Sequence, residues 1–332
     1  MRYASQLLAL FVAIVSAQVS DILAQTPDKT IRMGYIVWSN YSSRSHLEQA
    51  LLDGMRDRGY VEGKNLVVER RYVDVGGVEQ VRAAAGELAA LKLDAIVSTC
   101  SPSTAAVKQA TSNSGIPVVM AVVSDPVGQD LIASYGHPGG NITGLSSQGE
   151  DTLPKMLQYL FEVLASGTRI AVLHNTSNPA HPRLWQGLEQ AGSKLGTNLV
   201  RIDVAGRRDL AAAFDTIKRE RLGALRVLPD DNMTFNARAQ LLELVQRQRI
   251  PAIFGAREFV DGGGLMSYGT NYAASYRQAA IYVDRVLAGA KPADLPVEQP
   301  TRFEFVVNVA AAKALGVAIP QSLLLRADDV VR

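Results

Sequence analysis

The stretch IRMGYIVW (residues 31–38) is a short apolar run that ends in a polar loop, and RIAVLHNTSN (residues 169–178) has the same form. A helical pattern follows each run and ends at a glycine, the residue most common just after a helix C-terminus. Gly59 stands 27 positions after Arg32, and Gly196 stands 27 positions after Arg169. This equal spacing predicts that the chain contains two related halves.

The similarity of the halves continues along the chain. NLVVERRY (residues 65–72) matches NLVRIDV (198–204), and GIPVVMAVV (115–123) matches RIPAIFGA (249–256). In each half a helical pattern and a third strand lie between these two segments. Short apolar strands that alternate with amphipathic helices predict parallel sheets covered on both faces. The predicted fold class is therefore α/β, with two similar lobes.

The composition excludes several classes of protein. The chain has 332 residues, about twice the length of a typical domain, and is 47% hydrophobic and 20% charged, which argues against a disordered chain. Its 34 basic residues nearly balance 32 acidic ones, and no dense basic cluster is present, so we expect no nucleic-acid partner. One cysteine excludes a disulfide framework.

The first 24 residues have the pattern of a secretory signal peptide. Arg2 is followed by the apolar stretch LLALFVAIV (residues 7–15) and by small residues that include Ala17 and Ala24. This apolar stretch is shorter than the roughly 20 residues that span a membrane. No cysteine follows it, so a lipoprotein anchor is not expected. The sequence predicts export, with cleavage near Ala17 or Ala24.

The remaining chain divides into three parts. We expect an N-terminal lobe over residues 30–148, a C-terminal lobe over residues 149–270, and further segments over residues 271–332 that complete both lobes and a hinge. In the third part a helical pattern (residues 272–287) leads into a connector with three prolines (residues 288–300) and the strand-like FEFVVN. These extra segments predict that the chain crosses between the lobes more than once.

Ligands of open parallel sheets bind beyond the carboxyl ends of the strands. The two halves of the chain therefore indicate which loops face a ligand between the lobes. The candidate ligand-binding residues are Trp38, Ser39, Asn40, Tyr41, Cys100, Ser101, Ser103, Thr104, Asp125, Asn175, Asp230, Asp231, Phe254 and Tyr268.

The loops after the third strand of each half differ in character. In the first half, Ser101 is the predicted N-cap of a helix and Pro102 its first residue, so free N–H groups there could receive a carboxylate. The second half has Asp230 and Asp231, which could receive an ammonium group. Together these loops suit a zwitterionic amino acid. Helix capping alone is the alternative for both loops.

Four of the few aromatic residues fall at or beside predicted strand ends, where flat rings could enclose an apolar or aromatic group. For Phe254, packing in the core is the alternative. Trp38 is the stronger candidate because a polar loop follows it directly. These residues are Trp38, Tyr41, Phe254 and Tyr268.

Motifs for catalysis and for cofactors are absent from the sequence. No glycine-rich turn follows the first strand, GxxxxGK[ST] is missing, and the histidines form no HExxH motif. We therefore expect no cofactor, no metal and no enzymatic activity. Cys100 keeps one alternative open, because a thiol beside a helix N-terminus could act as a nucleophile. The second half has no matching cysteine.

The sequence resembles the tryptophan/tyrosine-type family of ABC-transporter substrate-binding proteins across nearly the whole mature chain. The segments that carry this resemblance are IRMGYIVW, LLDGMRDRGYVEGKNLVVERRY, SDP at residues 124–126, HPGGNITGLSS, RIAVLHNTSNP, GAREFVDGGGLMSYGTNY and NVAAAKALGVAIPQSLLLRADDVV. The resemblance implies a type I periplasmic-binding fold with two Rossmann-like lobes and a multi-segment hinge. It also implies ligand contacts at the same loops.

The expected function is that of an exported, periplasmic solute-binding protein of an ABC importer. It would capture an amino acid or aromatic carboxylate between its lobes and deliver this ligand to a membrane permease. We expect a monomer. Two alternatives stay open: a periplasmic sensor that presents the liganded form to a membrane receptor, and an exported enzyme that uses Cys100.

Overall fold

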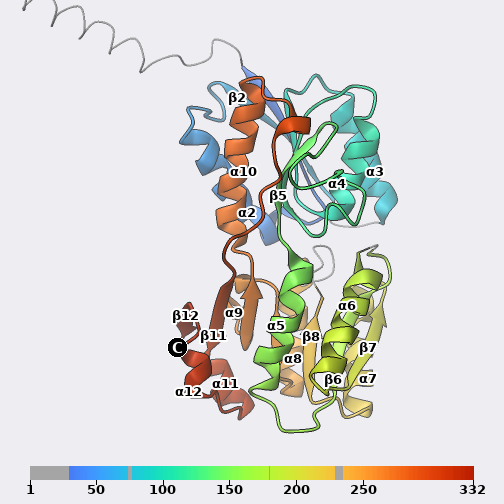
Figure 1. Ribbon diagram of the computed structural model, residues 1–332, viewed down its shortest axis with the longest axis vertical. Helices are drawn as coiled ribbons and strands as arrows, with labels where there is room; N and C mark the ends of the chain where they lie inside the picture. Colours follow the sequence, from blue (N-terminus) through green and yellow to red (C-terminus); the bar gives the residue numbers. More distant parts are fainter. Residues whose placement is uncertain (1–29, 74–76, 179, 229–234) are drawn as a thin grey trace, which may run out of the picture.

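The computed structural model describes residues 30–73, 77–178, 180–228 and 235–332. The predicted signal peptide (residues 1–24) and two of the candidate site residues, Asp230 and Asp231, lie outside these ranges. Among the described helices, none is both long enough and apolar enough to cross a membrane. The described chain folds into two lobes, each built on its own sheet (Figure 1).

The N-terminal lobe has a sheet in which all neighbouring strands are parallel, in the order β2-β1-β3-β4-β5. Its helices cover both faces, as expected for short strands that are apolar on both sides. One face packs against α2 and α10, and the other against α3 and α4. The elements are β1 (Ile31–Val37), α2 (Tyr41–Arg56), β2 (Leu66–Tyr72), α3 (Val78–Ala89), β3 (Ala95–Ser98), α4 (Ser101–Ala110), β4 (Val118–Val123), β5 (Ile142–Ser146) and α10 (Tyr272–Leu287).

The C-terminal lobe has a sheet in the order β12-β11-β10-β9-β8-β6-β7. Neighbouring strands are parallel except for β10 and β11, which are antiparallel, so β11 and β12 run opposite to the other five strands. The elements are α5 (Gly149–Phe161), β6 (Ile170–Asn175), α6 (His181–Lys194), β7 (Leu199–Val204), α7 (Leu210–Arg219), β8 (Ala224–Val227), α8 (Arg238–Gln248), β9 (Ala252–Phe254), α9 (Arg257–Asp261), β10 (Met266–Gly269), β11 (Glu304–Asn308), α11 (Val309–Leu315), α12 (Gln321–Leu324) and β12 (Asp329–Val331).

The two related halves predicted from the sequence are confirmed by the order of the strands. In each lobe the first strand of the half lies between the second and third, and the fourth follows, as β2-β1-β3-β4 and β7-β6-β8-β9. Gly59 and Gly196 follow the corresponding helices with φ of 86° and 66°. Only glycine adopts this left-handed backbone at little cost, which explains why both halves have it there.

The described chain passes between the lobes at three places: between β5 and α5, between β10 and α10, and between Glu298 and β11 (Figure 1). After the second crossing, α10 packs against α2 and β4 of the N-terminal lobe. The first two crossings contact each other, because the Thr270 hydroxyl donates a hydrogen bond of 2.9 Å to the Ser147 carbonyl. Three short adjacent segments therefore connect the lobes.

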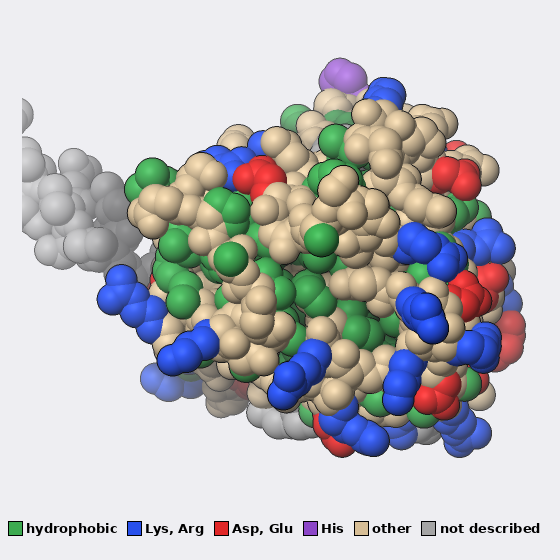
Figure 2. All heavy atoms as spheres, turned by 90° about the horizontal axis from the view of Figure 1, so that it is seen from below, with side chains coloured by type: hydrophobic (Ala, Val, Ile, Leu, Met, Phe, Trp, Pro, Cys, Tyr) green, Lys and Arg blue, Asp and Glu red, His purple; other side chains and the backbone are tan. Residues whose placement is uncertain are grey.

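The outer surface reflects the near-neutral composition. Figure 2 shows the molecule from below, over the end of the C-terminal lobe. Basic side chains lie around the rim of this face, with acidic side chains among them and apolar groups nearer the middle. This face has no continuous basic area of the kind that binds a phosphate backbone.

Candidate functional site

The carboxyl ends of β1–β5 in one sheet and of β6–β10 in the other face the boundary between the lobes, and side chains there join one lobe to the other. The Ser39 hydroxyl, just after β1, donates to Asn236 Oδ1 at 2.5 Å. The backbone N–H of Asn40 donates to the same oxygen at 3.1 Å. Asn236 lies just before α8 in the C-terminal lobe. The Asn40 side-chain amide also donates to this oxygen at 3.4 Å, so one amide oxygen receives three hydrogen bonds from the opposite lobe.

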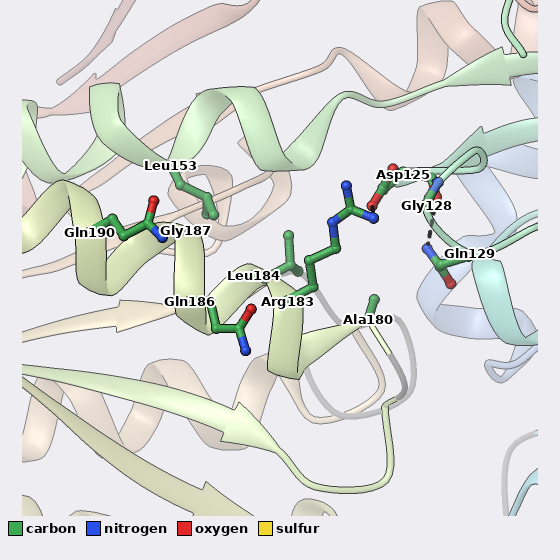
Figure 3. Close-up of a pocket in the computed structure, with 10 residues that line it drawn as sticks. All are labelled: Asp125, Gly128, Gln129, Leu153, Ala180, Arg183, Leu184, Gln186, Gly187 and Gln190. Carbon is green, nitrogen blue, oxygen red and sulfur yellow. Dashed lines mark hydrogen bonds and ion pairs between the residues drawn. The ribbon is translucent and has the colours of Figure 1, made fainter.

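An ion pair and a histidine–carboxylate hydrogen bond also cross the boundary. Arg183 Nη1, in the first turns of α6, lies 3.2 Å from Asp125 Oδ2 in the loop after β4 (Figure 3). Asp125 is held in place because its Oδ1 accepts a hydrogen bond of 2.9 Å from the Gly128 N–H. On another side of the boundary, His46 Nε2 of α2 lies 3.1 Å from Glu258 Oε1 of α9. The lobes are thus in direct contact through their side chains.

A pocket of about 370 Å³ lies between the loop after β4 and helices α5 and α6 (Figure 3). Leu153 and Leu184 form its apolar part, and Gln129, Gln186 and Arg183 contribute polar groups. This volume is within the range of small-molecule sites. Of the predicted site residues that the structure describes, only Asp125 lines this pocket.

The start of α4 differs from the sequence prediction. The N-cap is Cys100, and neither Ser101 nor Pro102 has the predicted position, because the backbone is extended at Cys100 (φ −153°) and already helical at Ser101. The Ser103 and Thr104 hydroxyls donate to the Cys100 carbonyl at 3.1 and 2.9 Å. Both side chains are fully buried, so these hydroxyls stabilise the first turn of the helix.

Ser101 connects α4 to the loop after β4. Its hydroxyl donates to the Ser124 carbonyl at 3.3 Å and accepts from Gln129 Nε2 at 3.1 Å. The same Gln129 nitrogen donates to the Ser124 carbonyl at 2.5 Å. Gln129 therefore orients two of the predicted loops. Sequence reasoning missed it because no pattern distinguishes one glutamine in an irregular loop.

Trp38 and Cys100 pack in the same apolar cluster of the N-terminal lobe, with 4% and 5% of their surfaces exposed. The indole N–H of Trp38 is buried and has no hydrogen-bond partner among the described residues. The Cys100 thiol lies 2.9 Å from the Ser103 hydroxyl. Tyr41 is the first residue of α2, but its side chain is outside what the structure describes.

Asn175 ends β6 and is almost fully buried. Its Oδ1 accepts a hydrogen bond of 2.9 Å from the Ser177 N–H, and its own N–H donates to His181 Nδ1 at 2.8 Å. These contacts fix the turn that leads from β6 into α6. Asn175 therefore supports the position of Arg183.

The structure places two of the predicted aromatic residues away from the cross-lobe contacts. Phe254 is fully buried in the core of the C-terminal lobe, where its ring stacks on Phe259 at 4.5 Å between centroids. Tyr268 packs edge-on against Tyr159 of α5 at 5.3 Å. Of the two roles considered for Phe254, ligand contact and packing in the core, the structure shows packing in the core.

Among the described residues no group of three or more histidine, cysteine and acidic side chains could hold a metal ion. The histidines near the boundary make other contacts. His174 Nδ1 lies 2.9 Å from Asp203 Oδ1, and burial lowers the pKa of His174 despite this carboxylate.

The fold and the contacts between the lobes define a type I periplasmic binding protein, two α/β lobes joined by several crossing segments. A model of the family "ABC transporter substrate binding protein" matches residues 35–331, and the chain belongs to this family. This confirms the resemblance that the sequence motifs indicated.

Known proteins with similar sequences and structures agree with this assignment. The chain is 24% identical over 277 residues to a tyrosine-binding protein of Clostridioides difficile, covering 83% of this chain and 78% of that protein. A conserved domain protein from Vibrio cholerae has 28% identity and a TM-score of 0.82, covering 91% of this chain and 100% of that structure. A Streptococcus pneumoniae ABC domain in complex with L-Trp has 24% identity and a TM-score of 0.83 with the same coverage.

Proposed function

We propose that this chain captures a small molecule between its two lobes and delivers it to an ABC permease, without catalysing a reaction on it. The hydrogen bonds from Ser39 and Asn40 to Asn236 carry the proposal, because they join the ligand-facing ends of the two sheets. Such contacts form when the lobes close and break when they open. Closure around a solute is how two-lobed binding proteins retain their ligands.

The proposed ligand is an amino acid or an aromatic carboxylate. The tyrosine-binding relative and the neighbour in complex with L-Trp support this class. We further propose that residues 1–24 direct the chain to the periplasm, that the mature protein is a monomer, and that residues 30–148 and 149–270 form the main parts of the lobes. The segments from residue 271 onward complete the lobes and provide the hinge.

Ligand binding would drive closure only if the ligand contacts both lobes, because a ligand shifts a conformational equilibrium by its difference in affinity for the two states. Cross-lobe contacts then add to the stability of the closed state. The three crossings between the lobes are short, so a rotation about them can separate the lobes without unfolding either sheet.

A thermal-shift screen of the chain without residues 1–24 tests this proposal. The panel contains amino acids, aromatic acids, sugars and nucleosides. We expect amino acids or aromatic carboxylates to raise the Tm, since a ligand at 100 times its Kd stabilises the native state by about 2.7 kcal/mol. A panel in which no compound raises the Tm would contradict solute capture.

The Cys100→Ala variant separates binding from catalysis by the thiol. Because Cys100 is buried and its thiol contacts Ser103, we expect the variant to bind the same ligand with an affinity within about threefold of the wild type. The wild type should return the ligand unchanged after prolonged incubation, as measured by mass spectrometry. Ligand conversion by the wild type that the variant lacks would support the enzyme alternative instead.

A further inference from the structure

Arg226 is fully buried within β8, in a strand whose other residues are Ala224, Leu225 and Val227. The other buried residue of fixed charge among the described residues is Glu48, which has a partner: Arg70 Nε lies 2.6 Å from its carboxylate. Arg226 has no such partner among the described residues. Its Nε and Nη2 atoms are buried, and within the part of the chain that the structure describes they have no hydrogen-bond partner.

A charged group without a counter-ion is unfavourable in a protein interior, and buried donors in native proteins are nearly always paired. Burial disfavours the charged form of the guanidinium and lowers the pKa of Arg226 to about 9. A buried guanidinium without a counter-ion lowers the stability of the fold, and a residue that destabilises the fold in this way often has a functional role. The missing partner is an anion.

The guanidinium of Arg226 lies at the carboxyl end of β8. Arg226 Nη1 donates to the carbonyl of Val227, the last residue of that strand. β8 is a central strand, since Arg226 is paired with Val172 of β6 and Ile253 of β9. The carboxyl ends of these strands face the opposite lobe, where ligands of parallel sheets bind.

Tyr272 connects this position to the boundary between the lobes. It is the first residue of α10, directly after the second crossing, and it packs against apolar clusters of both lobes. Tyr272 is also close enough to Arg226 for an electrostatic interaction. The guanidinium therefore lies beside a residue that contacts both lobes.

We propose that Arg226 is the specificity-determining residue of this binding protein, and that it binds the carboxylate of the captured solute through Nε and Nη2. This inference rests on the proposed function. Nε–H and Nη2–H lie on one edge of the planar guanidinium and point in parallel directions, which matches the two oxygens of a carboxylate. A lysine could not make this paired contact.

The contact between Arg226 and the ligand carboxylate would also favour closure of the lobes. In the closed protein without ligand, the guanidinium is dehydrated and lacks a counter-ion. Opening of the lobes allows water to reach it, whereas a bound carboxylate supplies the charge that the closed state lacks. The carboxylate thus favours the closed state more than the open one, which is the condition for ligand-driven closure.

Calorimetric titration of the mature chain tests this assignment with matched probes. L-Tyrosine and L-tryptophan are compared with L-tyrosinamide and L-tryptophanamide, which keep the ring and the amino group but lack the carboxylate. We expect the wild type to bind the acids at least about 100-fold more tightly than the amides, as for the loss of one partner of a buried charge pair. Arg226→Gln should lose a similar factor for the acids and little for the amides.

Two further variants separate recognition from folding. Arg226→Lys keeps the charge but not the paired donors, and we expect it to recover only part of the affinity for the acids. Arg247→Gln, at an exposed arginine of α8, should bind as the wild type does. Without ligand, Arg226→Gln should melt at the same or a higher temperature than the wild type, because it removes an unpaired buried charge.

Each contrary result has a distinct meaning. Equal affinity of the wild type for acids and amides, or an unchanged affinity of Arg226→Gln for the acids, overturns the assignment of Arg226 while solute capture stands. A lower Tm of the unliganded Arg226→Gln variant with unchanged binding shows that Arg226 has a structural partner within the chain. If neither the acids, the amides nor the wider panel binds the wild type, the proposed function itself fails.

Discussion

At the scale of single residues, Asn236 should contribute directly to closure, since its Oδ1 receives hydrogen bonds from both Ser39 and Asn40. Each such bond contributes about 0.5–1.5 kcal/mol. Asn236→Ala should therefore weaken ligand binding by roughly fivefold to a hundredfold, measured by calorimetry with a solute found in the screen. The core of each lobe is unchanged, so the free energy of unfolding should change much less.

The matched control for this variant is Asn113→Ala, at an exposed position in the N-terminal lobe. It removes the same side chain without touching the boundary and should bind as the wild type does. If Asn236→Ala also binds as the wild type does, the hydrogen bonds between the lobes do not contribute to the liganded state.

His174 should make the stability of the C-terminal lobe depend on pH. Burial lowers the pKa of His174 below its ordinary value of 6.5, although Asp203 opposes this effect. The unfolded chain then binds a proton more readily than the folded chain. The contribution of neutral His174 to the free energy of unfolding is fully present above about pH 6.5 and is lost progressively as the pH falls from that value through the lowered pKa of the folded state.

Urea unfolding between pH 7.5 and pH 5 measures this effect. We expect a shallower decline of the free energy of unfolding in His174→Gln than in the wild type. His137→Gln, at an exposed histidine of the other lobe, should keep the wild-type pH dependence. The same slope in all three proteins would show that His174 does not titrate differently in the folded and unfolded states.

At the scale of elements, the contact between α2 and α10 joins segments more than 200 positions apart in the sequence. Gly54 makes this contact possible: a Cβ atom there would lie 2.6 Å from the Arg277 carbonyl oxygen and 2.8 Å from the Ala280 Cβ. Gly54→Ala should therefore destabilise the N-terminal lobe by about 1–3 kcal/mol, the usual cost of overpacking.

Gly86→Ala is the control for Gly54→Ala, because Gly86 is in helix α3 and a Cβ atom there would meet nothing within 4 Å. In this variant the higher helix propensity of alanine should stabilise the protein by about 0.5–1 kcal/mol. Urea unfolding followed by circular dichroism distinguishes the opposite signs. Equal stability of the two variants would mean that α10 shifts freely on α2.

The sequence predicts most helices and strands, but not which elements the C-terminal ones pack against. Apolar runs and glycines after helices are local signals, so the four strands of each half and helices such as α10 were predictable to within a few residues. That α10 packs on the first lobe and that β11 runs antiparallel depends on contacts with distant segments. Cap preferences predict Ser101 as the N-cap of α4, one residue after the actual N-cap Cys100, because serine is a commoner cap than cysteine.

In the candidate site, too, local sequence patterns predict some of the residues but not their partners on the opposite lobe. Strand ends and turn residues identified Ser39, Asn40 and Asp125, which do contact the opposite lobe or its residues. Their partners Asn236 and Arg183 belong to irregular or helical segments with no sequence pattern of their own. Arg226 differs from both, because it is a single charge in an otherwise apolar strand, and such a charge is visible in the sequence.

At the scale of the whole molecule, the ion pair between Arg183 and Asp125 should bias the lobes toward closure. The pair alone is weak, since the Arg183 side chain is 66% exposed, but Asp125 is only 14% exposed and is fixed by Gly128. Arg183→Glu would place two like charges across the boundary. We expect a larger radius of gyration for the unliganded variant in small-angle X-ray scattering, and weaker ligand binding.

Salt provides the check on the cause of this change. In 1 M NaCl charges are screened beyond about 3 Å, so the radius of gyration of Arg183→Glu should return toward the wild-type value. Arg208→Glu makes the same change in net charge at an exposed position of the same lobe that does not line the pocket, and it should scatter like the wild type. Equal radii for all three proteins at low salt would mean that the hydrogen bonds to Asn236, not the ion pair, hold the lobes together. A difference that persists in 1 M NaCl would indicate altered packing at the boundary instead of charge repulsion.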